Sequence, residues 1–310
     1  MNENGCYENG KRYYTLDCFL KQKFGVKVAK ITLNGGFTCP NRDGSKGTGG
    51  CIYCSDKLGG EFAGCPSDSI AKQFAEGKAR LADKWRHTKY MPYFQTGTGT
   101  YAPTERLRGL YEAALAEKDV VALSIATRPD CITEETLSLL SDISRRTFLT
   151  VELGLQSVFD ATGERINRCT TYAEFLACYE RLCACGIAVC VHLINGLPGE
   201  TREMMLESVR TVSALKPWAV KLHLLHVLRG TVCEKMYREG RLTVFEKDDY
   251  VSLVCDQIEC LDRSIVLQRL TGDGARETLV APLWSMRKFE LLNAIDRELE
   301  RRESFQGIHA

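Results

Sequence analysis

The sequence predicts an α/β fold in which six strand–helix units build a partial (β/α)6 barrel of the TIM type. Apolar runs of strand length alternate with amphipathic helical stretches, and after the long first interval the runs start roughly 30 residues apart, as βα units do. The runs are almost continuously apolar, which is typical of parallel strands covered on both faces. Six right-handed units are too few to close a barrel of eight. We therefore expect an open barrel whose lateral mouth admits a macromolecular substrate.

The expected strands are residues 26–33, 90–95, 120–126, 148–155, 187–194 and 219–227. Helical periodicity predicts helices between them at residues 67–85, 104–116, 133–144, 171–184 and 201–215. Boundary signals support these helices. Pro103 precedes the second, Gly186 follows the fourth, and Glu134 and Glu135 place negative charge in the first turn of the third.

The pattern changes after residue 227. It predicts a helix at 246–260, a strand-like stretch at 264–270, a turn at Gly272-Asp273-Gly274 and a helix at 284–302. We therefore divide the chain into an N-terminal segment (1–25), a barrel core (26–230) and a small C-terminal extension (231–310).

A glycine-rich loop with three cysteines follows the first expected strand, and the rest of the chain is organised around it. Cys51 and Cys54 form a C-x-x-C pair, and Cys39 lies twelve positions before Cys51. Glycines let such a loop wrap closely round an inorganic core. Catalytic groups of βα barrels emerge at the C-terminal ends of strands, so the loop is correctly placed for a cofactor.

Three thiolates do not suit a closed structural zinc site, which takes four ligands. They do suit a [4Fe–4S] cluster that has three irons held by protein and one left open for a small molecule. If that molecule is S-adenosylmethionine (SAM), its amino and carboxylate groups chelate the open iron, and an electron from the cluster cleaves the sulfonium to a 5′-deoxyadenosyl radical.

Taken together, the motifs of the chain resemble those of the radical SAM proteins called YhcC/YtqA-like, which are related to the Elp3 and MiaB groups. The resemblance covers nearly the whole chain. It includes the cysteine loop and Lys11-Arg12-Tyr13-Tyr14, Thr127-Arg128-Pro129-Asp130-Cys131, residues 151–157, residues 196–200, residues 222–227, residues 269–273 and Gln306-Gly307.

The resemblance implies a radical SAM enzyme that takes hydrogen from an unactivated C–H bond. It also implies a tRNA substrate, in which the enzyme remodels a carboxymethylaminomethyl-type side chain of a wobble uridine, and an electron donor such as flavodoxin or ferredoxin. Two alternatives stay open. One is radical chemistry on a small metabolite or a protein, and the other is a non-catalytic iron–sulfur or zinc protein that binds RNA or carries electrons.

Several residues are expected to contact the cofactors. Cys39, Cys51 and Cys54 are the expected cluster ligands, and the resemblance puts Tyr53 beside the adenine of SAM. After the second strand, Gln95 and backbone groups from Thr96 onward would replace the usual Gly-Gly-Glu turn that binds the methionine amino group. The alternative for this stretch is a simple polar turn.

On the fourth strand Glu152, Gly154 and Gln156 alternate with apolar residues, so they share one face. A buried carboxylate needs a partner, which SAM could supply to Glu152. The resemblance places Gln156 and Ser157 near SAM, and Arg168 could pair with the methionine carboxylate. Cys169-Thr170 stand where the family has Gly-His, so any role of that histidine is absent or moved.

Two further strands carry candidates. Gly196 and Gly199 resemble a turn that supports adenine. Lys221 and His223 share a face of the sixth strand and are candidates for contacts to a substrate phosphate or carboxylate, or for proton transfer. Lys221 could equally extend to the rim, and His192 is more typical of a core histidine.

Composition sets the remaining limits. The 310 residues can bury a large core, and neither a long apolar run nor a signal-peptide core is present, so we expect a cytoplasmic protein without a membrane partner. The net charge of +1 favours neither membrane nor DNA binding. Residues 1–60 carry nine Lys/Arg against five Asp/Glu, which is either a solvated basic face or a contact for RNA.

Among the fifteen cysteines, Cys178, Cys183, Cys185 and Cys190 are interpreted mostly as small buried hydrophobic residues, with a second metal site as the alternative.

Overall fold

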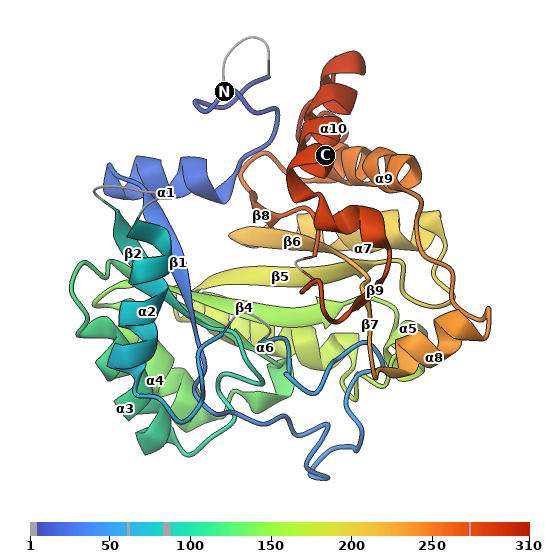
Figure 1. Ribbon diagram of the computed structural model, residues 1–310. Coiled ribbons are helices and arrows are strands. Elements are labelled where there is room, and N and C mark those ends of the chain that lie inside the picture. The colour runs from blue at the N-terminus through green and yellow to red at the C-terminus, as the bar shows by residue number, and fades with distance from the viewer. Residues whose placement is uncertain (1–4, 61–62, 83–87, 273) are drawn as a thin grey trace.

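In the computed structural model, which describes residues 5–60, 63–82, 88–272 and 274–310, seven parallel strands curve into a half-barrel (Figure 1). The strands are β1 (Val28–Leu33), β2 (Lys89–Phe94), β3 (Ala122–Thr127), β4 (Phe148–Gln156), β5 (Ala188–Asn195), β6 (Ala219–Leu224) and β8 (Val266–Arg269). They lie side by side in that order. The partial TIM-type barrel predicted from the sequence is therefore confirmed. It has one strand more than the six expected units, because β8 pairs in parallel with β6.

Helices cover the outer face of the sheet (Figure 1). The five predicted between the strands are α2 (Ile70–Ala82), α3 (Thr104–Leu115), α4 (Glu134–Ser144), α6 (Tyr172–Ala184) and α7 (Arg202–Ala214). Residues 83–85 of the predicted helix 67–85 lie outside the described residues. Threonine caps start several helices, and Thr171 with Glu174 forms a complete capping box at α6.

Three helices were not predicted. They are α1 (Leu16–Phe24), α5 (Asp160–Arg165) and α8 (Val232–Arg238). Both α5 and α8 are shorter than the window over which helical periodicity can be recognised. α1 begins at the N-cap Thr15 and ends at Gly25, which adopts the left-handed conformation (φ 72°).

An aromatic plug closes the N-terminal end of the barrel. Phe19 of α1 packs on Phe148 and Trp218 with ring centroids 5.5 and 5.1 Å apart, and Phe148 contacts Trp218 at 5.2 Å. These rings join apolar residues that start the strands, including Val28 and Ala219. These partly buried rings therefore cover the barrel interior at this end.

The C-terminal extension adds a strand to the half-barrel and helices that pack on its outside. β8 lengthens the sheet, and α9 (Lys247–Cys260) packs against α7 and α10 (Lys288–Arg301). Two short strands, β7 (Val227–Leu228) and β9 (Leu279–Ala281), form a separate antiparallel pair. The described residues also contain two 3₁₀ turns, η1 (Pro129–Cys131) and η2 (Leu283–Met286). The predicted turn at 272–274 contains Asp273, which lies outside the described residues.

Gln306 connects the two ends of the chain. Its side chain is fully buried, donates to the carbonyls of Asp262 and Ile265 at 2.8 Å, and accepts from the Tyr14 amide at 2.8 Å. These three hydrogen bonds hold the C-terminal segment against the segment that precedes α1.

The cysteines outside the loop differ in exposure. None of the fifteen, all of which lie in the described residues, forms a disulfide bond. Cys178 and Cys190 are buried as expected, but Cys183 is exposed and Cys185 is partly exposed. Both lie at the C-terminal end of α6, Cys183 in its last turn and Cys185 at its C-cap.

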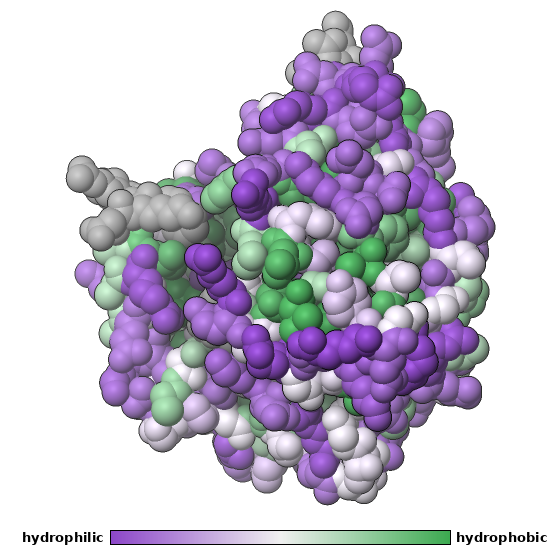
Figure 2. Space-filling model, turned by 45° about the vertical axis from the view of Figure 1, so that its right-hand side comes forward, coloured by the Kyte–Doolittle hydropathy of each residue, from purple (hydrophilic) through white to green (hydrophobic). Residues whose placement is uncertain are grey.

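On the surface, one face shows a hollow in which apolar residues gather inside a polar border (Figure 2). None of the helices in the described part of the chain combines the length and the apolar run needed to cross a bilayer.

Candidate functional site

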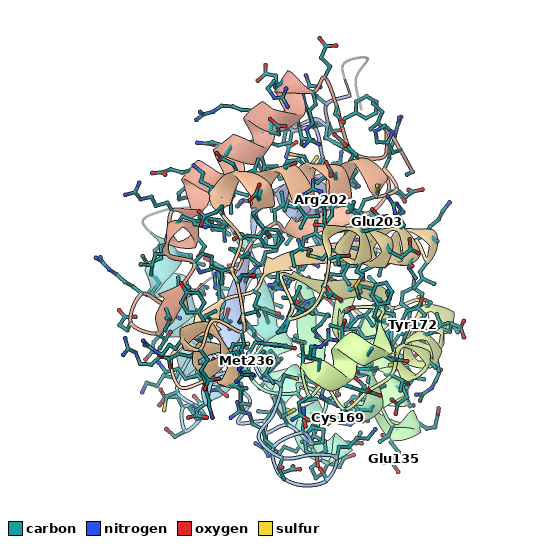
Figure 3. All side chains as sticks on the ribbon, turned by 90° about the vertical axis from the view of Figure 1, so that its right-hand side faces the viewer. Glu135, Cys169, Tyr172, Arg202, Glu203 and Met236 are labelled. Carbon is teal, nitrogen blue, oxygen red and sulfur yellow. The ribbon has the colours of Figure 1, made fainter. Side chains whose placement is uncertain are left out.

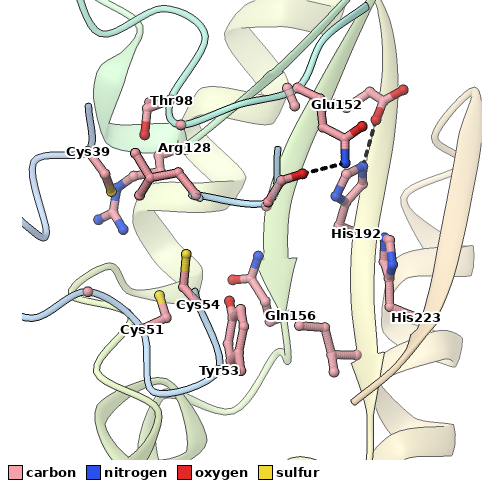
Figure 4. A pocket seen from close by; sticks show the side chains of 18 of the residues that line it. Cys39, Cys51, Tyr53, Cys54, Thr98, Arg128, Glu152, Gln156, His192 and His223 are labelled. Atoms are coloured by element: carbon pink, nitrogen blue, oxygen red, sulfur yellow. Dashed lines mark hydrogen bonds and ion pairs between the residues drawn. The ribbon is translucent and has the colours of Figure 1, made fainter. Parts of the chain in front are cut away.

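A cavity of about 340 Å³ lies at the C-terminal ends of the strands, inside the half-barrel. The loop thiols Cys39, Cys51 and Cys54 line one side of it, and polar side chains of β2, β4, β5 and β6 line the other (Figure 4). The curved sheet therefore brings the predicted cysteines and the predicted strand residues to one space.

The backbone of the loop turns the C-x-x-C pair toward the cavity. Gly49 and Gly50 adopt φ values of 78° and 76°, a conformation that costs glycine little, and the Gly50 amide bonds to the Asn41 carbonyl at 2.8 Å. The Cys54 amide then bonds to the Cys51 carbonyl at 2.9 Å, which closes a tight turn. Side chains on such a turn can point into one space.

The thiols interact electrostatically with each other. Burial raises the pKa of the Cys54 thiol to about 12, an effect that the Arg42 guanidinium opposes and that Cys51 and Cys39 increase. Burial also raises the pKa of Cys51, while Tyr53 and Arg128 act to lower it. Thiols in such a place become thiolates when they bind a metal, which supplies the missing positive charge.

The donor set fits an iron–sulfur cluster by its chemistry. It consists of three cysteines on one glycine-rich loop, and the cavity next to them leaves room for another ligand. Over residues 5–60, 63–82, 88–272 and 274–310, no three His, Cys, Asp or Glu side chains are grouped as a single metal ion would need.

Arg128 lies beside the thiols and was not predicted as a site residue. Its guanidinium forms a double contact with Asp130, with Nε–Oδ1 and Nη2–Oδ2 distances of 2.9 Å, and Nη1 donates to the Arg168 carbonyl at 2.9 Å. Lys46 of the cysteine loop reaches Asp130 at 3.2 Å. The only signal in the sequence was the position of Thr127-Arg128-Pro129-Asp130 at the end of the third strand.

Cys169 occupies a strained position next to the loop (Figure 3). Its φ of 57° lies in the left-handed region that favours glycine. Its Sγ contacts Asn41 Oδ1 at 3.2 Å, and the Asn41 amide in turn faces Cys51 Sγ at 3.8 Å. Cys169 therefore packs against the cysteine loop.

Glu152 is the centre of a polar floor deep in the barrel. We use this name for Glu152 and the five side chains that contact it. Its carboxylate is completely buried and accepts hydrogen bonds from Tyr93 at 2.5 Å, Ser124 at 2.9 Å and His192 at 3.0 Å. Lys30 contacts one carboxylate oxygen and Lys221 contacts the other. The partners come from β1, β2, β3, β5 and β6, which only the curvature of the sheet can bring together.

Burial and charge strongly shift the pKa values of this floor and of the neighbouring His223. Burial alone would raise the pKa of Glu152, but Lys221 and Lys30 hold it well below its ordinary value. Burial lowers the pKa of Lys221 to about 8, with Glu152 opposing. Burial, and then Lys221, lower the pKa of His192 to about 4. The pKa of His223 is lowered in the same direction, first by burial and then by His192.

Among the predicted cofactor-binding and catalytic residues, five more line the same cavity. They are Tyr53, Gln95, Gln156, Arg168 and His223. Gln156 stands at a register shift between β4 and β5 with a φ of 66°, a costly conformation for a residue with a side chain. The Gln95 amide also donates to the Gly59 carbonyl at 2.9 Å, which ties the second strand to the cysteine loop.

The Arg168 side chain is mostly committed to the protein. It is 2% exposed, and it donates to the carbonyls of Leu155 and Ser157 at 2.6 Å and of Thr170 at 2.8 Å. Asp160 takes a further N–H at 3.0 Å. Four of its five N–H groups are therefore used within the chain, so its expected pairing with a methionine carboxylate could use only the remaining one.

Four predicted residues lie away from the cavity. The Thr96 hydroxyl faces Gly60, and the Ser157 hydroxyl bonds to the Glu200 carboxylate. Gly196 and Gly199 line a second cavity of about 270 Å³, formed with the stretch from Arg241 to Phe245. A side chain at Gly199 would meet Arg165 Nη1 at 2.2 Å, so this glycine serves packing against α5. Sequence alternation could not reveal these orientations, since the chain turns immediately after each strand.

Comparison with protein families finds two matches along the chain. The model of the Radical SAM superfamily matches residues 39–212, and the model of the Radical SAM C-terminal domain matches residues 217–301. The first begins at Cys39, so it includes all three loop cysteines.

Two relatives differ in how much of their sequence they share with this chain. YtqA of Bacillus subtilis is 47% identical over 297 residues, which cover 96% of this chain and 92% of YtqA. The tRNA uridine(34) acetyltransferase of Methanocaldococcus jannaschii is 28% identical over 161 residues, 51% of this chain and 29% of that protein. Among solved structures, Elp3 of Methanocaldococcus infernus superposes with a TM-score of 0.67 at 17% identity, covering 90% of this chain and 64% of Elp3. This last likeness concerns the fold.

Proposed function

The chain belongs to the radical SAM superfamily, and from this membership we propose that it cleaves SAM reductively at a [4Fe–4S] cluster bound by Cys39, Cys51 and Cys54. The observation that carries the proposal is the pairing of three loop thiols with a cavity of about 340 Å³, on whose wall the strands place polar side chains such as Glu152 and Lys221. When bound, the cluster and SAM supply an electron and a 5′-deoxyadenosyl radical that takes hydrogen from a substrate C–H bond.

The residues of the chain then have separate tasks. Tyr53, Gln95 and Gln156 line the cavity between the thiols and the polar floor, and we assign SAM contacts to them. The aromatic plug under the floor excludes water from the interior, which protects a radical from unwanted hydrogen donors. Lys221 and His223 face the substrate from β6, at the opposite side of the cavity from the cysteines.

For the substrate, we propose tRNA with a modified wobble uridine, whose carboxymethylaminomethyl-type side chain would enter the cavity. Support comes from the partial similarity to an enzyme named for tRNA uridine 34, and from the open side of the half-barrel. We further propose a flavodoxin or ferredoxin as electron donor and a cytoplasmic site of action, where tRNA is found and thiols stay reduced.

The experiment is anaerobic reconstitution of the whole chain with iron and sulfide, followed by reduction and addition of SAM. We expect an electron paramagnetic resonance signal of the reduced cluster that changes on adding SAM, and slow release of 5′-deoxyadenosine. A cluster that is indifferent to SAM, or zinc in its place, would contradict the proposal.

The tRNA substrate is tested separately. Total tRNA from cells with and without the gene is digested to nucleosides and analysed by mass spectrometry, and the accumulating nucleoside is offered, within tRNA, to the reconstituted protein. A mass change in that tRNA, dependent on SAM, supports the proposal. SAM cleavage without any change in tRNA would leave the radical chemistry intact and favour a metabolite or protein substrate.

A further inference from the structure

We infer that Asn41 raises the reduction potential of the proposed iron–sulfur cluster by donating a side-chain N–H to the thiolate of Cys51. The inference deepens the proposed function, on which it rests for the cluster but not for SAM cleavage or for the substrate. Asn41 acts through Cys51, so it is a positioning residue and not a catalytic one.

The Asn41 side chain lies inside the cysteine loop, two residues after Cys39. It is 0% exposed, so bulk water does not compete for its polar groups. The carbonyl of Asn167 takes one of its two N–H groups, and Nδ2 also lies 3.8 Å from Cys51 Sγ. A thiol is a weak acceptor, but the same sulfur becomes a thiolate when it binds a metal. The second N–H is therefore placed to bond to Cys51 when the cluster is bound.

The neighbours of the amide determine which of its ends faces Cys51. The backbone carbonyl of Asn167 only accepts hydrogen bonds, so the Asn41 atom that faces it must be the nitrogen. On the other side, the Cys169 thiol donates to Oδ1 at 3.2 Å. In the reversed orientation an oxygen would face both the Asn167 carbonyl and the Cys51 sulfur, and both would lose their donor. The hydrogen-bond network therefore directs an N–H toward Cys51.

The acceptor Asn167 is itself fixed to the cysteine loop. It adopts the left-handed conformation, with a φ of 55°, which asparagine tolerates better than most residues. Its own side-chain amide donates to the carbonyls of Thr48 at 3.1 Å and Gly50 at 2.8 Å. These bonds tie the turn at residue 167 to the loop just before Cys51, so that Asn41 and Cys51 keep their relative position.

Gly47 makes room for this arrangement. A Cβ at residue 47 would lie 2.4 Å from Asn41 Oδ1 and 3.0 Å from Cys169 Sγ. The φ of Gly47 is not among the positive values of the chain, so the close approach, and not the backbone conformation, requires glycine here. The loop is thus packed closely around the Asn41 amide.

A hydrogen bond to a cluster thiolate affects the two oxidation states differently. Reduction adds one negative charge to the cluster and its thiolates, so an N–H donor stabilises the reduced state more than the oxidised one. Burial strengthens the effect, because the effective dielectric constant inside the protein is low. The bond from Asn41 therefore makes the cluster easier to reduce, and reduction is what SAM cleavage requires.

Two other groups act on Cys51, but they differ from Asn41 in their position. The Tyr53 hydroxyl and the Arg128 guanidinium interact with the Cys51 thiol, and both side chains line the cavity (Figure 4). Their contacts can change when a ligand enters. Asn41 does not belong to the residues that line the cavity, so its contact is a fixed property of the loop.

The test measures the midpoint potential of the reconstituted cluster without SAM, by redox titration followed by electron paramagnetic resonance. Asn41→Leu keeps the size of the side chain and removes the N–H. We expect a more negative midpoint, so that at a fixed potential the ratio of reduced to oxidised cluster falls about threefold or more, as for loss of one hydrogen bond. Cys169→Ser is the matched control. It changes the other side of the same amide and keeps the N–H toward Cys51, so its midpoint should equal that of the parent protein.

Asn41→Asp is the second variant. Its side chain has the shape of asparagine but no N–H, and a protonated carboxyl would give its one O–H to the Asn167 carbonyl, so its midpoint should also be more negative. An Asn41 variant that holds a full cluster at the parent midpoint, or an equal shift in Cys169→Ser, would overturn the inference. Loss of the cluster from both Asn41 variants would overturn it too, since Asn41 would then hold the loop together and not set the potential.

The outcomes for the proposed function are separate, because the titration needs the cluster but no SAM. A parent protein that cleaves SAM, with an Asn41→Leu midpoint equal to its own, refutes only the role of Asn41. A parent protein whose cluster shows the expected shift in the variants but never cleaves SAM keeps that role and refutes the radical chemistry.

Discussion

The guanidinium of Arg128 forms a double ion pair with Asp130, two residues away, and this pair connects three parts of the site. Nε and Nη2 lie 2.9 Å from the two carboxylate oxygens, and the side chains are 12% and 5% exposed. The pair holds the guanidinium next to the loop thiols, where its charge acts to lower the pKa of Cys51. Lys46 ties the cysteine loop to the same carboxylate.

Asp130→Asn should therefore destabilise the protein by about 2–4 kcal/mol, since it leaves the largely buried charge of Arg128 without its counterion. Urea unfolding of the cluster-free protein measures this. Asp142→Asn removes an exposed i,i+3 partner of Arg145 and should cost less than about 1 kcal/mol. Equal decreases in the free energy of unfolding for the two variants would show that the Arg128–Asp130 pair stabilises the protein no more than an exposed ion pair does.

Cys54→Ala should abolish cluster binding, because two thiolates cannot hold the cluster at three corners. Iron content and the visible absorbance of reconstituted protein give the measurement. Cys65→Ala is the control, since Cys65 is exposed and does not line the cavity. Retention of a full cluster by Cys54→Ala would refute the ligand assignment.

Arg168→Ala should lower stability more than it lowers SAM affinity. The variant leaves the buried carbonyls of Leu155 and Ser157 without their donor, at a cost of about 1–3 kcal/mol each. Thermal unfolding and SAM binding by calorimetry, on the same preparation, separate the effects. If the variant kept native stability but lost SAM binding, the result would support the ion pair between Arg168 and the methionine carboxylate of SAM.

Stability should fall as the pH drops from 6.5 toward 4, because His192 has a pKa of about 4 in the folded state against an ordinary value of 6.5. In this range the unfolded chain binds a proton that the folded protein does not, so acid favours unfolding. The shift corresponds to about 3 kcal/mol at most.

Urea midpoints measured across this pH range check the expectation. His192→Gln should flatten the dependence, while His309→Gln, at the exposed C-terminus, should leave it as it is. An identical slope for His192→Gln and the parent protein would show that other groups cause the loss.

The second cavity, lined by Gly196 and Gly199, shows what a glycine motif does not predict. Gly196 and Gly199 were expected to support adenine, yet they line a separate cavity next to Phe245. Their positive φ values, 91° and 77°, explain why glycine stands there. A glycine motif reveals the backbone conformation it permits, but not which cavity the turn adjoins.

By itself the sequence determined the features that depend on neighbours along the chain. The period of apolar residues predicted six strands and their order, and the spacing of Cys39, Cys51 and Cys54 predicted one ligand loop, because both patterns are local. The tertiary structure decided which side chains meet. Lys30 and Lys221 lie 122 and 69 positions from Glu152, and they contact it only because strand register and sheet curvature turn their faces into one interior. The tertiary structure also placed β8 beside β6. The free backbone groups of β6 at the sheet edge are the hydrogen-bonding partner that β8 finds only in the folded barrel.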